Sequence, residues 1–542
     1  MILRNPLNFI SQLLTNTSKQ LRNIYLNSDY YNKKISKINS NNLFYKPSPH
    51  LLSSLIKYQK KKINIDDIEI ENLWDKKNIN FQDFRKLNNF YWFFSLDLKS
   101  SKKKTQNIIS EWIIKNFRYN SKSWEFDLTS KRIIAWLSNH NLTIEGGGKD
   151  YLENFNEIIQ KQTNHLMNEI KNSKIVDDKI IGCAAIILVG LCFKVEKNYL
   201  TFGLSLLKKI SILSFDNYGF PKSRNIKQLI FYLKYFILIR EWFKEAQIDI
   251  PDHINETIYY LGQGYAFLWQ NIKSDVLMNG NNISNNSEFD QYLKRLGYRF
   301  KNDNKEFGGY VILYNKKISI VMDAGPPPSS KFSSKYQSGA LSFEINSNGK
   351  KLISNCGNYE SKRSKLIELS KSTATHSTLV IDDSSSCRYK KYNENYLVNN
   401  GLKILKKNIV FEKNYWKINV THDGYYKKYG TIHERNIEFY PEQFKFVGTD
   451  KILNKKKNLN LKFDIRFHLE PDVKLMKTQD NKAILIELNN EGWKFTCNNF
   501  EINIDNGLYF GNKNSYTQNQ NIFIAGITNS PNENIIWQLS KI

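Results

Sequence analysis

The spacing of hydrophobic positions changes near the middle of the chain. From about residue 51 to residue 268, apolar residues recur mostly at intervals of three and four, the period of an amphipathic helix. Pro221 and Pro251 fall between such segments, where prolines end helices. The pattern therefore predicts helical hairpins, arranged as a solenoid or as a ring. The expected helices are 81–98, 108–116, 128–137, 151–170, 180–193, 201–213, 226–243 and 254–269.

After about residue 271 the spacing becomes two, and the segments are short and rich in β-branched and aromatic residues. Turn sequences such as 346–349 and 489–492 separate them, and no helical segment intervenes, so we expect an antiparallel sandwich or a stack of sheets. The expected strands are 318–323, 341–345, 352–355, 377–381, 416–420, 437–440, 463–467, 483–488 and 522–527.

The boundary between the two halves is predicted at the Asn- and Ser-rich stretch 279–287. We therefore expect three segments: an N-terminal extension (1–42), a helical domain (43–278) and an all-β domain (288–542). Residues 9–14 are too short and polar for a convincing signal-peptide core, so a cytoplasmic protein is the plain interpretation, with export by another route left open. The apolar run 180–193 suits a buried helix better than a membrane span.

Composition narrows the function only partly. The 542 residues include 79 Lys and Arg against 52 Asp and Glu, a formal net charge of +27. The lysine runs are spread along the chain, so this charge permits an anionic partner without requiring one. The five Cys include no CxxC pair, which makes structural zinc held by cysteines unlikely, and phosphate-loop, HExxH and dinucleotide-binding motifs do not occur.

One candidate cluster lies between two predicted helices. Residues 215–225 read FDNYGFPKSRN and gather Tyr218, Arg224 and Asn225 in one short loop. The loop is interpreted either as a helix–helix turn with Ser223 as a helix N-cap, or as an exposed rim that presents a cation and a phenol to a ligand.

Histidines form the second candidate group. His376 directly precedes a predicted strand, and His422 and His433 lie eleven residues apart across a Gly-containing turn. A hairpin there would bring the last two imidazoles together, and with His376 they would make a metal site or a proton-transfer cluster. Each histidine alone is more typical of a structural group. His468 shares a strand face with Arg466.

The order of these segments resembles the heparinase II/III family of polysaccharide lyases. The resemblance runs from about residue 83 to the C-terminus and includes the loop 216–225. The β-domain motifs that carry it are 323–327, 338–344, 355–357, 375–382, 422–425, 433–435 and 466–469.

The resemblance implies an incomplete (α/α) toroid followed by an antiparallel β-sandwich, with the substrate cleft between them. It also implies β-elimination on an acidic, uronate-containing polysaccharide. The implied roles are neutralisation of the substrate carboxylate by Arg224 and Asn225, and base or charge stabiliser for His376. Tyr218 and Tyr232 are the candidate phenols.

The resemblance also implies a possible divalent metal, Zn or Ca, at His376, His422 and His433, with Asp382 as a further candidate, and a place in the cell envelope or periplasm. Two positions depart from the family pattern, because Phe220 and Gln337 stand where histidine is frequent. The expected partner is an acidic polysaccharide and not nucleic acid. The alternative function is a non-catalytic glycan-binding or cell-envelope assembly protein on the same scaffold.

Overall fold

The computed structural model describes residues 17–37, 43–53, 65, 73–74, 79–96, 100–193, 198–360, 364–392, 395–455, 460–512 and 515–542. The chain divides into two compact units. The first comprises Met1–Leu213 and Tyr232–Ile258, and the second comprises Ser214–Phe231 and Tyr259–Ile542. This division follows contacts within the chain, so the limits expected at residues 42, 278 and 288 stay predictions. Residues 9–14 lie outside the described residues.

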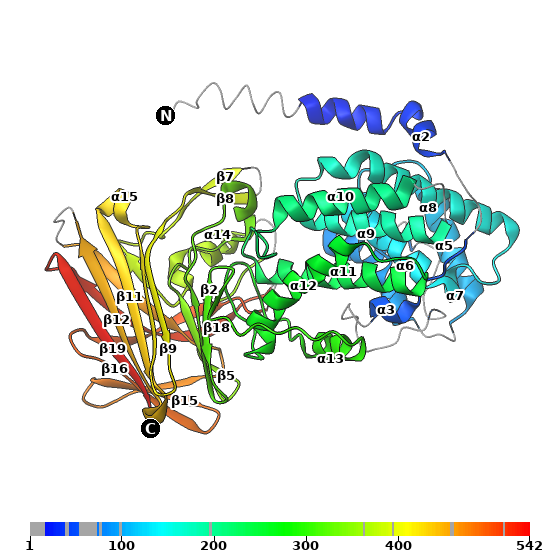
Figure 1. Cartoon of the computed structure of the whole chain (residues 1–542). Helices are drawn as coiled ribbons and strands as arrows, with labels where there is room; N and C mark the ends of the chain where they lie inside the picture. Colours follow the sequence, from blue (N-terminus) through cyan, green and yellow to red (C-terminus); the bar gives the residue numbers. More distant parts are fainter. Residues whose placement is uncertain are drawn as a thin grey trace. The chain divides into compact units, whose positions relative to one another are not determined.

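The first unit is helical (Figure 1). Its most apolar helix, α9, contacts both α6 and α8, and every residue from Ile180 to Phe193 is buried. Burial on all sides explains why this helix lacks a polar face. The helices that begin in this unit are α2 (Asp29–Ile35), α3 (Pro49–Ser53), α4 (Phe81–Asn88), α5 (Lys102–Asn116), α6 (Phe126–Ser138), α7 (His140–Thr143), α8 (Lys149–Glu169), α9 (Val176–Phe193), α10 (Asn198–Ser214) and α12 (Asp252–Tyr265). Helix α11 (Ile226–Glu245) runs from the second unit into the first.

The helix expected over residues 81–98 is wrong from residue 89 to residue 96, and residues 97–98 lie outside the described residues. Helix α4 ends at Asn88, and Phe90 has a left-handed backbone with φ of 56°. A 3₁₀ turn, η2 (Tyr91–Ser95), follows. The Phe90 ring packs edge-on against Trp112 and Trp136, and this aromatic packing accompanies a conformation that bulky residues seldom adopt.

No helix among the described residues has the length and apolar character that crossing a membrane requires.

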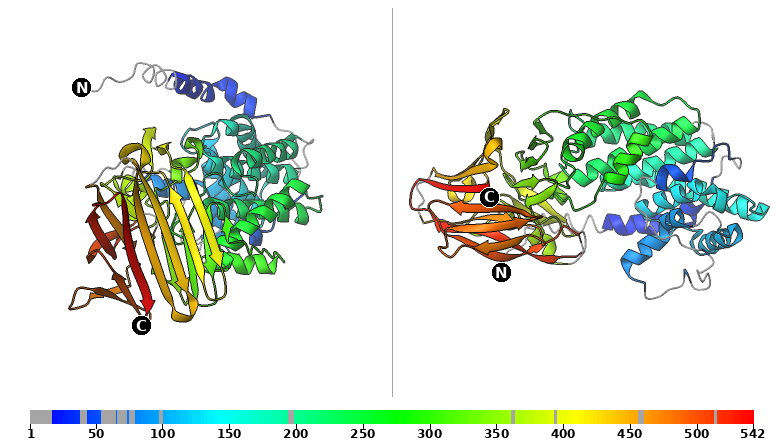
Figure 2. Two further views of the ribbon diagram at one scale, coloured as in Figure 1. Left: turned by 60° about the vertical axis from the view of Figure 1, so that its left-hand side comes forward. Right: turned by 90° about the horizontal axis from the view of Figure 1, so that it is seen from below.

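The second unit contains all of the described strands, and every pair is antiparallel. An eight-stranded sheet has the order β14-β15-β16-β19-β12-β11-β10-β9, and Figure 2 shows its yellow-to-red strands side by side. A five-stranded sheet, β1 to β5, and a four-stranded sheet, β17-β18-β13-β6, share one buried core with it. Strands β7 and β8 form a separate hairpin.

The strands of the five-stranded sheet are β1 (Glu306–Phe307), β2 (Tyr310–Tyr314), β3 (Ile318–Asp323), β4 (Phe343–Ser347) and β5 (Lys350–Ile353). Those of the four-stranded sheet and the separate hairpin are β6 (Leu379–Ile381), β13 (Lys462–His468), β17 (Ile502–Tyr509), β18 (Thr517–Ile527), β7 (Arg388–Tyr392) and β8 (Asn395–Asn400). Those of the eight-stranded sheet are β9 (Ile404–Phe411), β10 (Trp416–His422), β11 (Thr431–Tyr440), β12 (Lys445–Asn454), β14 (Lys474–Lys477), β15 (Ala483–Leu488), β16 (Glu491–Cys497) and β19 (Asn532–Lys541).

The Asn-rich stretch 279–287 is buried for much of its length. Asn279 donates to the Tyr310 hydroxyl at 2.7 Å, and Asn282 donates to the carbonyl oxygens of Asn358 and Phe510. Both amides are at most 4% exposed. Their side chains satisfy buried polar groups, so polar composition here marks a hydrogen-bonded core segment. Helix α13 (Ser287–Arg295), which was not expected, begins where the stretch ends.

Candidate functional site

The loop between α10 and α11 is a tight turn within the second unit. The Asp216 carboxylate accepts hydrogen bonds from the backbone amides of Tyr218 and Phe220. Gly219 has a φ of 75°, and a Cβ atom there would lie 2.3 Å from Cβ of Tyr260, so glycine is required on both grounds. The Tyr218 side chain is 70% exposed.

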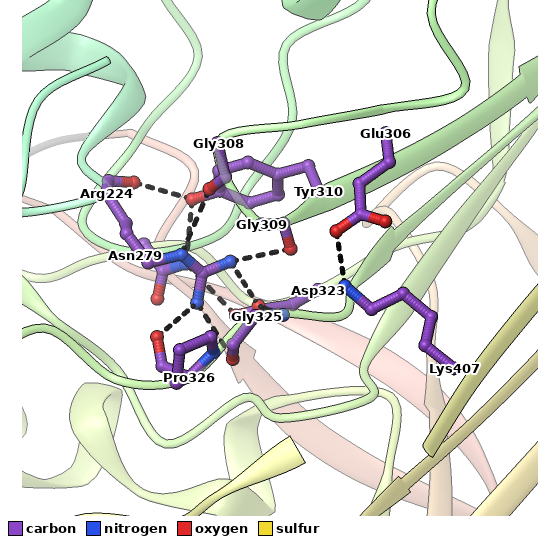
Figure 3. A network of polar contacts seen from close by, with 10 residues as sticks. All are labelled: Arg224, Asn279, Glu306, Gly308, Gly309, Tyr310, Asp323, Gly325, Pro326 and Lys407. Carbon is purple, nitrogen blue, oxygen red and sulfur yellow. Dashed lines mark hydrogen bonds and ion pairs between the residues drawn. The ribbon is translucent and has the colours of Figure 1, made fainter. Parts of the chain in front are cut away.

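Arg224 is buried, which contradicts the expected exposure of this part of the loop. The residue is 7% exposed and has a φ of 56°. Its guanidinium donates to Asp323 Oδ1 at 2.6 Å and to four carbonyl oxygens, as Figure 3 shows. These oxygens belong to Gly308, Gly309, Gly325 and Pro326, at 2.8–3.2 Å.

These contacts engage all of the N–H groups of Arg224. The guanidinium also lies 4.8 Å from the centre of the Tyr310 ring. Burial lowers the pKa of Arg224, but the charge of Asp323 outweighs it and the pKa is raised overall. The geometry therefore describes a structural ion pair with no N–H left for a substrate carboxylate.

Asn225 is the N-cap of α11. Its side-chain oxygen accepts from the Gln228 amide at 2.8 Å, and its Nδ2 donates to the Asn279 carbonyl at 2.9 Å. The expected cap, Ser223, instead donates to the Gln228 side chain at 2.6 Å. Asn225 thus satisfies a helix end and holds the 279–287 stretch.

A short series of contacts leads from this loop toward His376. The amide of Gly280, next to Asn279, donates to the side-chain oxygen of Gln337 at 2.8 Å. Two residues further on, Gly339 lies against the His376 imidazole, because a Cβ atom on Gly339 would be 3.0 Å from the ring. The loop and the histidine are therefore linked through buried groups of one compact unit.

His376 is the candidate whose polar atoms are not committed to the fold. The residue is 1% exposed, and neither ring nitrogen has a hydrogen-bond partner among the described residues. Burial, with a smaller contribution from His468, lowers its pKa to about 3. The imidazole is thus neutral near pH 7, because burial disfavours its protonated form. A buried imidazole whose nitrogens lack hydrogen-bond partners costs free energy in the fold. This cost distinguishes His376 from the other candidate residues.

The two candidate phenols lie in different units. Tyr218 belongs to the second unit and Tyr232 to the first. Tyr232 is buried and donates to Asp177 at 2.8 Å. Burial and the Asp177 charge raise its pKa well above the usual value, which disfavours its ionised form.

A cavity of about 740 Å³ borders the loop 216–225. Tyr218, Lys222 and Arg224 line it from the loop, and Phe307 and Phe332 line it from the β-domain sequence. Glu306, which also lines it, forms an ion pair with Lys407. The cavity combines aromatic faces with charged groups, which suits a polar ligand with an apolar ring face.

Comparison with known protein families gives a match for the sequence of the β-domain. Residues 305–538 match the family model described as "Heparinase II/III-like, C-terminal". This is a heparinase II/III-like domain. For these residues, the family resemblance expected from the sequence is confirmed.

One curated relative matches part of the chain. FtsZ-localized protein C of Caulobacter vibrioides (strain NA1000 / CB15N) is 26% identical over 248 residues, which are 43% of this chain and 42% of that protein. The chain thus spans less than half the length of that relative.

Solved structures share the fold over most of the chain. A structure of heparinase III has 15% identity and a TM-score of 0.66, covering 90% of this chain and 80% of that chain. A mutant of heparan sulfate lyase HepC from Pedobacter heparinus has 13% identity and a TM-score of 0.65, covering 94% and 87%. The expected fold class, a helical part followed by an antiparallel β part, is confirmed.

Within the heparinase II/III-like domain, His422 and His433 meet across the β10–β11 pair, as the hairpin pattern predicts. The Gly424 amide donates to Nδ1 of His422, which leaves the His422 proton on Nε2 to donate to Nδ1 of His433 at 3.2 Å. His433 in turn donates to Asp450 at 2.7 Å, and Asp450 also binds Arg435. Burial lowers the pKa of both imidazoles, so this relay is neutral and structural near pH 7.

The predicted metal site is not formed. Among the described residues, no three His, Cys, Asp or Glu side chains are grouped so as to hold a metal ion. His422 and His433 bind each other and Asp450 instead of converging with His376, and Asp382 accepts from the Tyr429 hydroxyl at 3.1 Å. The His, Cys, Asp and Glu side chains of the described residues therefore do not fit the implied metal.

Several residues that shape the site give little signal in the sequence. Asp323 and Tyr310, which complete the surroundings of Arg224, lie about a hundred residues away along the chain. Asp323 falls in a recognised motif, but nothing in its neighbours identifies Arg224 as its partner. Gln337, one of the two departures from the family pattern, is buried and joins Gly280 to the carbonyl oxygens of Gly357 and Ser370.

Proposed function

We propose that the protein cleaves an acidic, uronate-containing polysaccharide by β-elimination, with His376 as the proton acceptor. The observation that carries the proposal is the buried imidazole of His376, whose two ring nitrogens have no hydrogen-bond partner among the described residues. The fold shared with heparinase III and heparan sulfate lyase supports the substrate class.

The chemistry needs a base, an acid and a group that offsets the substrate carboxylate. The base takes the proton from carbon 5 of the uronate, and the electron pair of that bond forms the double bond between carbons 4 and 5. The bond from carbon 4 to the glycosidic oxygen then breaks, and the departing oxygen takes a proton. We assign the acid to Tyr218 and the offsetting charge to Lys222, since both line the cavity beside the loop and both are exposed.

Arg224 and Asn225 have a different role in this proposal. Their polar groups are bound to Asp323, to backbone carbonyls and to the end of α11, so they position the loop and do not contact the substrate carboxylate. Tyr232 is likewise left out of the reaction because its hydroxyl is held by Asp177.

A panel of acidic polysaccharides tests the proposal, with ultraviolet absorbance of the unsaturated uronate as the readout. We expect one polysaccharide to give this signal and His376→Gln to lower turnover at least roughly a hundredfold. Tyr232→Phe is the control and should retain turnover. Full turnover by His376→Gln, or the absence of the chromophore with every polysaccharide, would contradict the proposal.

A non-catalytic glycan-binding or envelope-assembly function is the second candidate. It is favoured by the full engagement of Arg224 and by a curated relative named for its localisation with FtsZ. Binding of an acidic polysaccharide without any new absorbance would favour this candidate.

A further inference from the structure

A second cavity lies in the same compact unit and shares no lining residue with the cavity beside the loop 216–225. Its volume is about 570 Å³. The lining residues come from η5 (Ser330–Lys335), the 358–360 segment, α14 (Leu366–Lys371) with residues just before it, and the β7–β8 hairpin. The cavity is therefore a separate feature of the heparinase II/III-like domain.

Positive charge predominates in this cavity. Its charged lining residues are Lys335, Lys365, Lys371, Lys391, Glu360 and Glu368. Glu360 forms an ion pair with Lys227, which is outside the lining, at 2.8 Å, so part of the negative charge is already offset. Tyr359 and Tyr396 add aromatic rings to the wall. Such a lining suits an anionic ligand that also has an apolar face.

Lys371 is the buried cation of the group, at 4% exposure. Its Nζ donates to the carbonyl oxygens of Ser334 and Tyr336 at 2.8 and 2.9 Å. An ammonium has three N–H donors, so one remains after these two bonds. Among the ion pairs of the described residues, none includes Lys371. Lys351, which is buried to a similar degree, instead binds Glu344 at 2.7 Å.

A buried ammonium without a counter-charge is costly. Burial, with a contribution from Lys335, lowers the pKa of Lys371 to about 7. Two neutral carbonyl oxygens orient the ammonium but do not cancel its charge. An anion in the cavity would supply the missing charge and a charge-assisted hydrogen bond.

We propose that this cavity binds the carboxylate or sulfate group of an acidic sugar, with Lys371 as the buried cation and the exposed Lys335, Lys365 and Lys391 around it. The inference rests on the acidic-glycan part of the proposed function and is independent of cleavage. It assigns a subsite to a part of the domain that carries none of the candidate reacting groups.

The backbone connects this subsite to the segment that carries His376. The carbonyl of Lys371 accepts from the Ser338 amide at 2.9 Å, and Thr373 donates to the Ser338 carbonyl at 2.7 Å. Gly339, next in the chain, lies against the His376 ring. A sugar anion bound at Lys371 is thus held by the same short segment that positions the proposed base.

Calorimetric titration of the full chain tests the inference with two probes, inorganic sulfate and a heparin-derived oligosaccharide. We expect the oligosaccharide to bind and Lys371→Met to weaken its affinity at least roughly tenfold. Lys390→Met is the matched control, because Lys390 is the exposed neighbour of Lys391 on β7 and does not line the cavity. It should bind as the wild type does.

The outcomes separate this inference from the proposed cleavage. Lys371-dependent binding of the oligosaccharide without unsaturated product would support the subsite while contradicting the lyase. Unchanged affinity in Lys371→Met, no binding of the oligosaccharide, or Lys371-dependent binding of sulfate alone would overturn the subsite. If Lys371→Met does not fold, the double variant Lys365→Ser/Lys391→Ser replaces it, since both side chains are exposed, and unchanged affinity there overturns the inference equally.

Discussion

Arg224 and Lys371 are both buried cations of the second compact unit, but their charges are met in different ways. The Arg224 guanidinium lies 2.6 Å from the Asp323 carboxylate and binds four carbonyl oxygens as well. The Lys371 ammonium binds two carbonyl oxygens and borders a cavity lined by further lysines. A cation whose counter-charge is built into the chain stabilises the fold, whereas one without a counter-charge gains most from an anion that arrives from outside.

The positive charge of the chain therefore has different roles at different residues. Sequence motifs draw attention to the arginine, because it ends a recognisable loop, yet its geometry is that of a structural group. The lysine has no motif of its own and is one of 79 basic residues. Burial and the identity of the partners, and not the presence of a positive charge, decide which cation is available to a ligand.

The largest expected effect is on the free energy of unfolding, and it comes from removing the Arg224 cation, whose charge Asp323 compensates. Arg224→Met leaves the Asp323 carboxylate buried without its cation, and we expect the free energy of unfolding to fall by about 3–5 kcal/mol. Denaturant unfolding of the full chain measures this loss. Lys371→Met is the paired variant and should cost far less, because no buried carboxylate loses its partner. A loss below about 1 kcal/mol for Arg224→Met would mean that the ion pair is not structural.

The second effect is a dependence of stability on pH that originates in Lys371. Its pKa is about 7 in the fold, while an unfolded lysine has a pKa of about 10.4. Below pH 7 both states hold the proton, so the cost of the buried charge is fully present. Between about pH 7 and about pH 10 the unfolded state binds more protons, and the free energy of unfolding rises by up to about 1.4 kcal/mol per pH unit.

Comparison of the wild type with Lys371→Met isolates this rise, because Lys335 and the phenols of Tyr336 and Tyr389, which surround Lys371, are present in both proteins. Chemical unfolding at several pH values measures it. Parallel pH profiles for the two proteins would show that the Lys371 ammonium is not penalised by burial.

Much of the fold follows from local patterns. Strands 318–323 and 483–488 occur with the expected limits, because period-two spacing and flanking turns are properties of the local sequence. The contact of His422 with His433 also follows, since a hairpin of eleven residues fixes which positions face each other. Long-range partners are different, because no local pattern encodes them.

The candidate site shows this limit clearly. The residues that accept hydrogen bonds from the Arg224 guanidinium lie 84 to 102 positions away. The loop sequence alone therefore cannot show that all of its N–H groups are used. The burial of the Asn-rich stretch cannot be inferred from its composition for a related reason, because an Asn side chain that satisfies a buried carbonyl is the same residue as one in solvent. The burial of Lys371 also cannot be inferred from the sequence, since its two acceptors are backbone carbonyls, which every residue has.

The third prediction asks whether the rest of the loop is structural as well. Asn225→Ala removes the acceptor for the Gln228 amide and should lower the free energy of unfolding by about 1 kcal/mol. Asn225→Asp keeps the cap acceptor but loses the donor to the Asn279 carbonyl, so it separates the two contacts. Thermal unfolding compares the variants. An Asn225→Ala protein of wild-type stability but without turnover would return Asn225 to a role at the substrate.

The smallest expected effect concerns an exposed lysine of the second cavity. Lys391 lines the cavity but is exposed, so solvent and salt screen its charge, in contrast with that of Lys371. Lys391→Met should weaken binding of the heparin-derived oligosaccharide by roughly two- to threefold, the scale of an exposed ion pair. Titration at low and at high salt measures this, and the difference should shrink as salt rises. A loss of affinity equal to that of Lys371→Met, or one that salt leaves unchanged, would contradict this prediction. It would mean that the charge that binds the ligand lies at the cavity opening and that buried and exposed cations do not differ in this role.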